Sequence, residues 1–385
     1  MAKRANFVNI QLSHQLPTKE GECFRIRTGY ERVLAHRVSD LYSYSAKQNG
    51  KVLEIDPSIG MCKIQYSDKS VHVFQFGEKY GECADMVTTQ KSVLTVKVGD
   101  TFKTGDILAY NPEFFELDPT VRQVDWKHGV GATVALMDCS GTYEDSSIIT
   151  EDLGRKLEIE PIHIRSISFN SNTFIHSIKK VGEHVDINDP LVIFEDATMT
   201  DMSSISSDEV ALDYLAKLNR ITPKAKHTGT IVKIEAYYSI PTIEMHPSLG
   251  SVIKTIIKQN NSKFKFSQGT IDSIKYPPSV PLNEGTKFKK VKFEKDTVVL
   301  RFFIKEGITA GIGDKIVFDS SLKSVISTTL VDTPETESGL PIDAVFSGSS
   351  ISNRIINSPM IVGIGERVME KLEESVIDMY FNSEK

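Results

Sequence analysis

Short runs of β-branched and aromatic residues recur along the chain, and they constrain its fold more than any other feature. Such residues favour extended backbone, while the Gly, Asp, Asn and Pro that bound the runs favour short turns. The clearest predicted strands are residues 71–76, 91–99, 133–138, 163–169, 229–238 and 297–305. The sequence therefore predicts an α+β protein that is mainly β with some α.

A turn pattern recurs between these strands. VKVGDTFKTGDILA (96–109) and IKKVGEHVDINDPLVIF (178–194) both place a Gly and an acid after an apolar residue, and then step through Asp into another apolar strand. IKEGITAGIGDKIVF (304–318) is similar. Glycine supplies backbone angles that other residues avoid, and Asp accepts hydrogen bonds from turn amides. This pattern is typical of strand–turn–strand steps in closed or half-closed β-barrels.

Few helices are predicted. SSDEVALDYLAKLN (206–219) opens with a good N-cap sequence. Near the C-terminus, apolar residues recur every three or four positions from Ile361 to Met379, which predicts one apolar helical stripe. Such a stripe packs either on a core or against a partner helix.

Composition excludes several classes of protein. The chain has no run of eighteen apolar residues, so no membrane span is predicted, and its N-terminus lacks the apolar segment of a secretory signal. The four cysteines and nine histidines are scattered, which indicates neither a disulfide framework nor a zinc site. A soluble protein of a reducing compartment is expected.

Charge is distributed unevenly. The net charge of −6 argues against a chain that coats nucleic acid alone, yet residues 251–295 contain ten lysines and three acids. This segment is either a solvated loop or strand surface or a phosphate-facing one.

Three groups of charged residues could carry chemistry. Glu144 and Asp145 follow a predicted strand and either begin a helix or hold water or a magnesium ion. Lys315 and Lys323, eight residues apart, either end an ordinary hairpin or neutralise neighbouring phosphates. Arg354 follows the small polar loop of SGSSISNRI and could bind a phosphate with two parallel hydrogen bonds.

Read in chain order, these motifs resemble the β subunit of bacterial multisubunit RNA polymerases. CSGTYEDSSIITEDL (139–153) is similar to the family's GYNYEDAIIISE, with Glu144 and Asp145 on its acidic pair. GDKIVFDSSLKSVIS (313–327) is similar to its GDK…GRHGNKG-V-I-S, with Lys315 and Lys323 on its two lysines. DTPETESGLPIDAVFSGSSISNRI (332–355) resembles the segment that carries the family arginine, here Arg354.

The departures from the family pattern are informative. FDSSL replaces the family's residues between the two lysines, so Asp319 stands in place of an arginine, and Ser324 replaces the glycine after the second lysine. The resemblance covers only the later-middle part of a full β subunit. Such a divergent, shortened chain is most similar to the split polymerases of large-genome bacteriophages.

The resemblance implies a double-psi β-barrel core that binds the RNA–DNA hybrid, with an inserted wall and flap module. The implied division is an N-terminal part of the hybrid-binding region at 1–90, a discontinuous barrel half-site at 91–165 plus 290–360, a wall/flap insert at 166–289, and a partner-contacting C-terminal helix at 361–385.

It also implies roles for single residues. Lys315, Lys323, Arg354, Glu144 and Asp145 would serve nucleotidyl transfer. Lys287, Lys289 and Lys290, at the junction of the insert and the barrel half-site, would join the first two in binding nucleic acid.

The resemblance also implies partners and a cofactor. The flap helix would either present Val210, Tyr214 and Leu215 to an initiation factor or pack these residues on the flap itself. No sequence like NADFDGD, the family's magnesium-binding loop, occurs in the chain. Mg²⁺ would therefore be bound chiefly by a β′-like partner, with Glu144 and Asp145 near the second ion. Other β fragments, DNA template, RNA and nucleoside triphosphates complete the implied partners. The implied location is the host cytoplasm or the virion.

Three other functions stay open on sequence alone. The chain could be a β-barrel structural or assembly protein, a non-catalytic nucleic-acid-binding module, or a degenerate polymerase relative without activity. The spatial relation of Glu144, Lys315, Lys323 and Arg354 separates the first of these from a polymerase.

Overall fold

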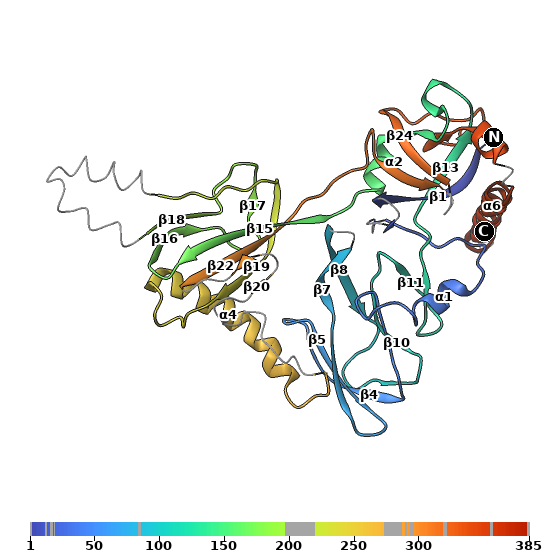
Figure 1. Ribbon diagram of the computed structural model, residues 1–385. Coiled ribbons are helices and arrows are strands. Elements are labelled where there is room, and N and C mark those ends of the chain that lie inside the picture. Colours follow the sequence, from blue (N-terminus) through green and yellow to red (C-terminus); the bar gives the residue numbers. More distant parts are fainter. Residues whose placement is uncertain are drawn as a thin grey trace. The chain divides into compact units, whose positions relative to one another are not determined.

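The computed structural model describes most of the 385-residue chain (Figure 1). The residues outside the description are 1, 12–13, 16–17, 19, 84–85, 197–219, 273–286, 289–290, 293–295, 319–321, 355–356 and 383–385. Side chains are also not described at 2–11, 14–15, 81–83, 86, 259–260, 287–288, 291–292 and 318.

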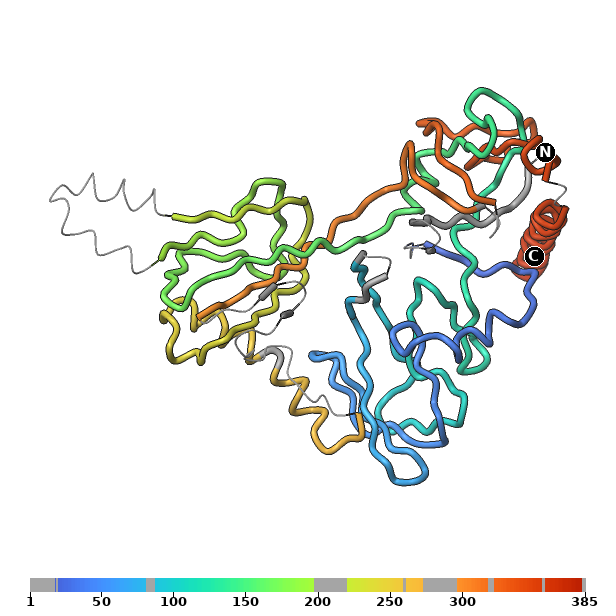
Figure 2. Tube along the Cα trace, in the orientation of Figure 1, coloured from blue at the N-terminus to red at the C-terminus, as the bar shows by residue number. Residues whose placement is uncertain are grey.

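The chain forms two compact units, each made from separate stretches of sequence. The first unit contains residues 1–52, 76–160 and 307–385, and the second contains 53–75 and 161–306. The trace in Figure 2 can be followed through both. The described structure is mixed, with more strand than helix, as the sequence predicts. The four-part division of the chain stays a prediction.

The first unit holds most of the short strands of the described chain, together with four α-helices and the 3₁₀ helix η1. Its elements are β1 (Ala2–Gln11), β2 (His14–Gln15), α1 (Tyr30–Leu34), β3 (Ser43–Ser45), the start of β4 (Gly50–Asp56), β7 (Gly77–Cys83), β8 (Met86–Leu94), β9 (Thr101–Phe102), β10 (Ile107–Tyr110), β11 (Phe115–Leu117), β12 (Val124–Trp126), β13 (Val130–Leu136), η1 (Ser140–Thr142), β14 (Ser146–Thr150), α2 (Glu151–Lys156), β23 (Lys315–Phe318), β24 (Leu322–Leu330), β25 (Ala344–Phe346), α5 (Gly348–Asn353) and α6 (Ser358–Asn382).

A curled sheet organises this unit. Its strand order is β13-β25-β14-β24-β23-β1-β2, and β1 also pairs with β13, so the pairings run in a circuit. Two neighbouring pairs, β13–β25 and β14–β24, are parallel, while the other pairs are antiparallel. The side chains inside the curl are apolar and buried, among them Val134, Ile149, Leu322, Ile326 and Phe346.

The recurring turn pattern works as the sequence predicts. Gly99 and Gly313 have φ of +88° and +92°, in the region that side chains disfavour. The Asp of each pattern accepts a hydrogen bond from a turn amide: Asp106 Oδ2 from Lys103 N at 2.9 Å, and Asp314 Oδ2 from Gly311 N at 2.8 Å.

The second unit is an antiparallel sheet backed by one long helix. Its elements are the end of β4, β5 (Met61–Tyr66), β6 (Val71–Gln75), β15 (Pro161–Asn170), β16 (Thr173–Ile178), β17 (His184–Val185), β18 (Val192–Asp196), β19 (Gly229–Tyr238), α4 (Pro247–Ser267), β20 (Lys287–Phe288), β21 (Val291–Lys292) and β22 (Thr297–Lys305). Strand β22 lies between β15 and β19, and seven of its nine residues are buried. Helix α4 lies along this sheet (Figure 1). Its Leu249 and Ile253 are fully buried in the core between them.

Two sequence expectations are wrong. The strand expected at 91–99 ends at Leu94, because the chain turns there toward the Gly99 turn. The lysine-rich segment, interpreted as loop or strand surface, contains helix α4 over its first part. The helix begins with Pro247 after His246, whose side chain accepts from Ser248 N, so Pro and an N-cap start it despite the high charge.

The chain enters and leaves the 161–306 stretch through two segments that lie side by side. Within the first unit, Ile159 and Ile308 exchange backbone hydrogen bonds of 3.0 and 2.9 Å. Within the second unit, Glu306 N donates to Pro161 O at 3.1 Å. The entry and exit of this stretch are therefore adjacent.

Within the first unit, helix α6 is bound to the segment before α1 by a buried carboxylate. Glu366 is fully buried, and its two oxygens accept from Arg25 N at 3.0 Å and Ile26 N at 2.5 Å. The predicted apolar stripe is present, and its members Ile361, Val368, Leu372, Val376 and Met379 are exposed. No described helix has both the length and the apolar character needed to cross a bilayer.

We predict that Gly229→Ala destabilises the second unit. Gly229 has φ +155°, and a Cβ at this position would lie 2.2 Å from Lys305 O in β22. The free energy of unfolding, measured by denaturant titration, should fall by roughly 2–4 kcal/mol. Gly311→Ala, which meets nothing within 4 Å, is the matched control. Equal stability of the two variants would contradict the close approach.

We predict that Glu366→Ala loosens the attachment of α6. The substitution leaves the backbone amides of Arg25 and Ile26 without their acceptor, and each lost hydrogen bond costs about 1 kcal/mol. Hydrogen exchange at Arg25 and Ile26 should accelerate. Asp378→Ala, at an exposed position on the same helix, should leave that exchange unchanged.

Candidate active site

The acidic pair lies on the turn between β13 and β14. The Thr142 hydroxyl closes this turn by donating to Met137 O and accepting from Cys139 N, both at 2.9 Å. Glu144 has φ +53°, a left-handed conformation that is uncommon outside glycine. The interpretation of this pair as a helix N-terminus is wrong, because β14 follows the pair and α2 begins only at Glu151.

Arg354 is brought to the acidic pair by helix α5. Its Nη2 lies 2.5 Å from Asp145 Oδ1 and 2.6 Å from Oδ2, and both side chains are partly exposed. The SGSS sequence expected to be a loop forms the start of this helix, with Ser347 as its N-cap. Ser350 adds a second tie by donating its hydroxyl to Glu144 O.

The two lysines lie on one antiparallel hairpin. Lys315 of β23 is opposite Val325 of β24, and Lys323 is opposite Val317. Residues opposite each other on paired strands point to the same face of the sheet, and so do residues two apart on one strand. Lys315 and Lys323 are therefore diagonal neighbours on one face, with Cα atoms about 7–8 Å apart. Both lysines are exposed, and neither has an acidic partner within the described part of the chain.

Strand β24 connects the lysines to the acids. Its other edge pairs in parallel with β14, where Ser146 is opposite Val325, and Val325 N donates to Asp145 O at 3.1 Å. Lys315, Val325 and Ser146 therefore form one row across three strands, which spans about 10 Å at ordinary strand spacing, and Asp145 directly precedes Ser146 in the chain. All five predicted catalytic residues thus belong to one end of one sheet, although 210 positions separate Glu144 from Arg354.

This arrangement does not form a magnesium cage from the described residues. Asp145 is already paired with Arg354, while the Glu144 carboxylate has no partner in the described chain. Mg²⁺ requires near-octahedral oxygen coordination, so one unpaired carboxylate is too few. Among the described residues, the arrangement thus places exposed cations and one unpaired acid at the same end of the sheet.

Sequence reasoning missed Asp138, which positions α5. Its carboxylate accepts from Ser347 Oγ at 2.7 Å and from Ser349 Oγ at 2.5 Å. The Ser349 hydroxyl, followed by that of Ser347, holds the pKa of Asp138 below its ordinary value. An acid directly after a strand and a serine-rich N-cap sequence were the available signals, but their pairing over more than 200 positions was not readable.

Ser324, the residue that departs from the family glycine, has a structural role. Its hydroxyl donates to Ser147 Oγ at 2.9 Å, and both residues are buried between β24 and β14. Ser327, three residues later, donates to Gly141 O and to Ser147 O. Serine in place of the family glycine therefore adds a buried hydrogen bond between β24 and β14.

Several predicted site residues cannot be placed. Val210, Tyr214 and Leu215, with the whole predicted flap helix, lie outside the described residues. Lys289 and Lys290 also lie outside, and only the backbone of Lys287 is described, in β20 of the second unit. Asp319 is outside as well.

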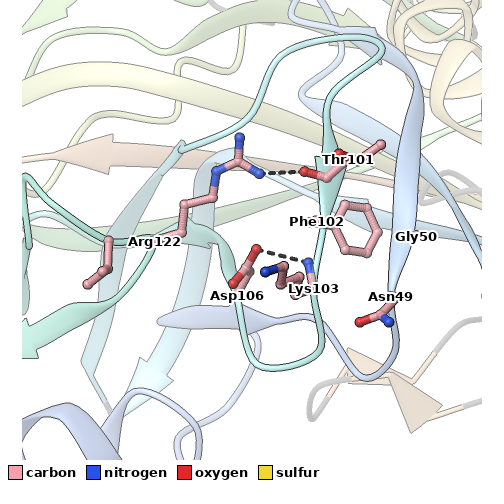
Figure 3. Close-up of a pocket in the computed structure, with 8 residues that line it drawn as sticks. Asn49, Gly50, Thr101, Phe102, Lys103, Asp106 and Arg122 are labelled. Carbon is pink, nitrogen blue, oxygen red and sulfur yellow. Dashed lines mark hydrogen bonds between the residues drawn. The ribbon is translucent and has the colours of Figure 1, made fainter.

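A separate hollow of about 590 Å³ lies elsewhere in the first unit, beside β9 (Figure 3). Two hydrogen bonds join residues drawn there: Arg122 Nη1 donates to Thr101 O at 2.7 Å, and Asp106 accepts from Lys103 N at 2.9 Å. These pairings serve the turns of the fold, and none of the predicted catalytic residues lines this hollow.

We predict that the Ser324–Ser147 bond stabilises the candidate site. Ser324→Ala leaves the buried Ser147 hydroxyl without this partner, so the free energy of unfolding should fall by about 1–2 kcal/mol. The double variant Ser324→Ala/Ser147→Ala should lose less than twice that amount. Thr328→Ala, exposed on the same strand, is the control. Strictly additive losses would show that the two hydroxyls are not coupled.

No protein-family model matches the chain, and no curated protein matches it. The function proposed next rests on the motifs of the sequence and on the arrangement of their side chains.

Proposed function

We propose that this chain is a β-subunit fragment of a multisubunit DNA-dependent RNA polymerase and contributes half of the nucleotidyl-transfer site. The observation that supports this proposal is the gathering of Glu144, Asp145, Lys315, Lys323 and Arg354 at one end of the curled sheet. These are the five residues that carry the resemblance, and nothing in their sequence spacing requires them to meet.

In this proposal the two lysines neutralise phosphates at the growing RNA 3′ end. Two exposed lysines on neighbouring strands, with Cα atoms about 7–8 Å apart, suit consecutive phosphates of a backbone whose sequence is not read. Before the nucleotide arrives, the ion pair with Asp145 keeps Arg354 in place. When the nucleotide binds, Arg354 leaves Asp145 and pairs with the triphosphate. Magnesium, bound chiefly by a β′-like partner chain, supplies Lewis-acid chemistry when present.

The proposed barrel is of the double-psi type. A circuit of pairings that mixes two parallel with several antiparallel pairs supports this finer assignment. The stretch 161–306, which leaves and re-enters at adjacent segments, supports an inserted wall and flap module. The exposed apolar stripe of α6 supports contact of this helix with another subunit.

The second unit favours an added role in binding nucleic acid. Three exposed lysines of α4, Lys254, Lys258 and Lys265, fall within about 40° of arc on one helical face. Such a basic stripe attracts a phosphate backbone without reading bases. A non-catalytic nucleic-acid-binding protein is the alternative that this observation supports.

The decisive experiment removes both lysines of the hairpin. The tagged chain is purified with the polypeptides that bind it, and extension of an RNA primer on a DNA template is measured. Lys315→Ala/Lys323→Ala should lower the rate on the order of a hundredfold, about 2.7 kcal/mol of transition-state stabilisation. The complex should keep its subunits.

The matched control is Lys51→Ala/Lys97→Ala, which removes two exposed lysines of the same unit. Full primer extension by the Lys315→Ala/Lys323→Ala complex would contradict the proposal. Recovery of an RNA-binding chain with no polymerase partner would favour the non-catalytic alternative.

A further inference from the structure

Two histidines and a glutamate meet in the second unit, outside the candidate active site. They are His163 of β15, His227 of the loop before β19, and Glu306, which directly follows β22. Their ligand atoms all lie within 4.8 Å of one another. His163 Nε2 lies 2.9 Å from Glu306 Oε2, and His227 Nδ1 lies 3.7 Å from the same oxygen.

The backbone fixes all three residues at one end of the sheet. His163 is opposite Ile304, and Glu306 N is bonded to Pro161 O, so these two side chains lie on neighbouring strands and share a face. His227 precedes Gly229 by two residues. Gly229 lets β19 approach the carbonyl of Lys305 more closely than a side chain would allow.

One atom of this group lacks a satisfactory partner. His163 Nε2 is screened from solvent, and although it is close to Glu306 it makes no well-aligned hydrogen bond. A buried polar atom without such a bond is costly, and an ion or water is a common reason for one. The two imidazole rings are stacked, with centroids 3.6 Å apart and planes within 2° of parallel.

We propose that His163, His227 and Glu306 bind one divalent transition-metal ion of the zinc type. Bonds of about 2.0–2.1 Å place tetrahedral ligands about 3.3 Å apart, and the observed 2.9 and 3.7 Å bracket this value. Each nitrogen binds in the plane of its ring, so a ring leaves the stack on binding. His227, which is about half exposed, has the room to turn.

Two imidazoles and a carboxylate select the metal. This ligand set suits zinc, cobalt and similar ions and leaves at least one position for water, whereas Mg²⁺ prefers oxygen ligands. The site differs in this way from the magnesium of the proposed polymerase chemistry. Its ligands adjoin Pro161 and Gly307, where the chain enters and leaves the second unit, so the ion would clamp the base of β15, β19 and β22.

The test uses the full chain, freed of any histidine tag and of metal, and titrated with Co²⁺. We expect one equivalent of Co²⁺ to give the visible absorption of a four- or five-coordinate site, and Zn²⁺ to displace it. Zn²⁺ should raise the melting temperature, while Mg²⁺ should neither displace Co²⁺ nor raise the melting temperature. His227→Ala should weaken Co²⁺ binding at least about tenfold without lowering the melting temperature of the metal-free chain. Glu306→Gln should weaken it too.

His72→Ala is the matched control, because His72 forms a comparable pair with Asp272 in the same unit, 2.6 Å apart, without a second histidine. It should bind Co²⁺ like the unchanged chain. Absence of Co²⁺ binding, or equal binding by the His227→Ala variant, would overturn the proposal and show an ordinary ion pair. Neither result bears on primer extension, so the two proposals fail independently.

Discussion

The candidate site depends on the pairing of one strand, β24, along both of its edges. One edge carries the lysine hairpin and the other carries β14 and the acidic turn. Because side chains alternate faces along a strand, a slip of one residue in either pairing would send the lysines into the core. The buried residues Leu322, Ser324 and Ile326 prevent such a slip, since they alternate with the exposed Lys323 and Val325. The register of this strand in the curled sheet thus also sets the geometry of the site.

Polar side chains that pack beside the candidate site fix the positions of its charged residues. Asp138 binds the first turn of α5 through two serine hydroxyls, and Ser324 joins β24 to β14. These side chains touch no proposed ligand, yet they determine where Arg354 and Asp145 lie. A charge that is already oriented loses little freedom when its ligand arrives, which is the benefit of preorganisation.

The sequence was most informative where local preference and burial agree. β19 and β22 have the bounds predicted from their apolar and β-branched runs, and α6 follows its stripe of apolar residues. Helix α4 was missed because its many lysines resemble a solvated segment, although only one face carries its core residues.

The site was less predictable than the elements. The lysine hairpin could be expected from GDK and the polar turn, and its eight-residue spacing follows from the register. The approach of Arg354 to Asp145 could not, because it depends on pairings between segments 200 positions apart. The metal-ligand group was missed for the same reason: scattered histidines reveal nothing about spacing until β15, β19 and β22 are aligned.

The side-by-side entry and exit of residues 161–306 have a consequence for how such a chain can change over time. A segment whose two ends lie next to each other can change in length without moving the strands of the first unit that precede and follow it. The entropic cost of bringing the ends of such a segment together rises only with the logarithm of its length. Insertions and deletions in this stretch are therefore tolerated far better than in the short turns between β13, β14 and β24, so the two units are free to diverge at very different rates.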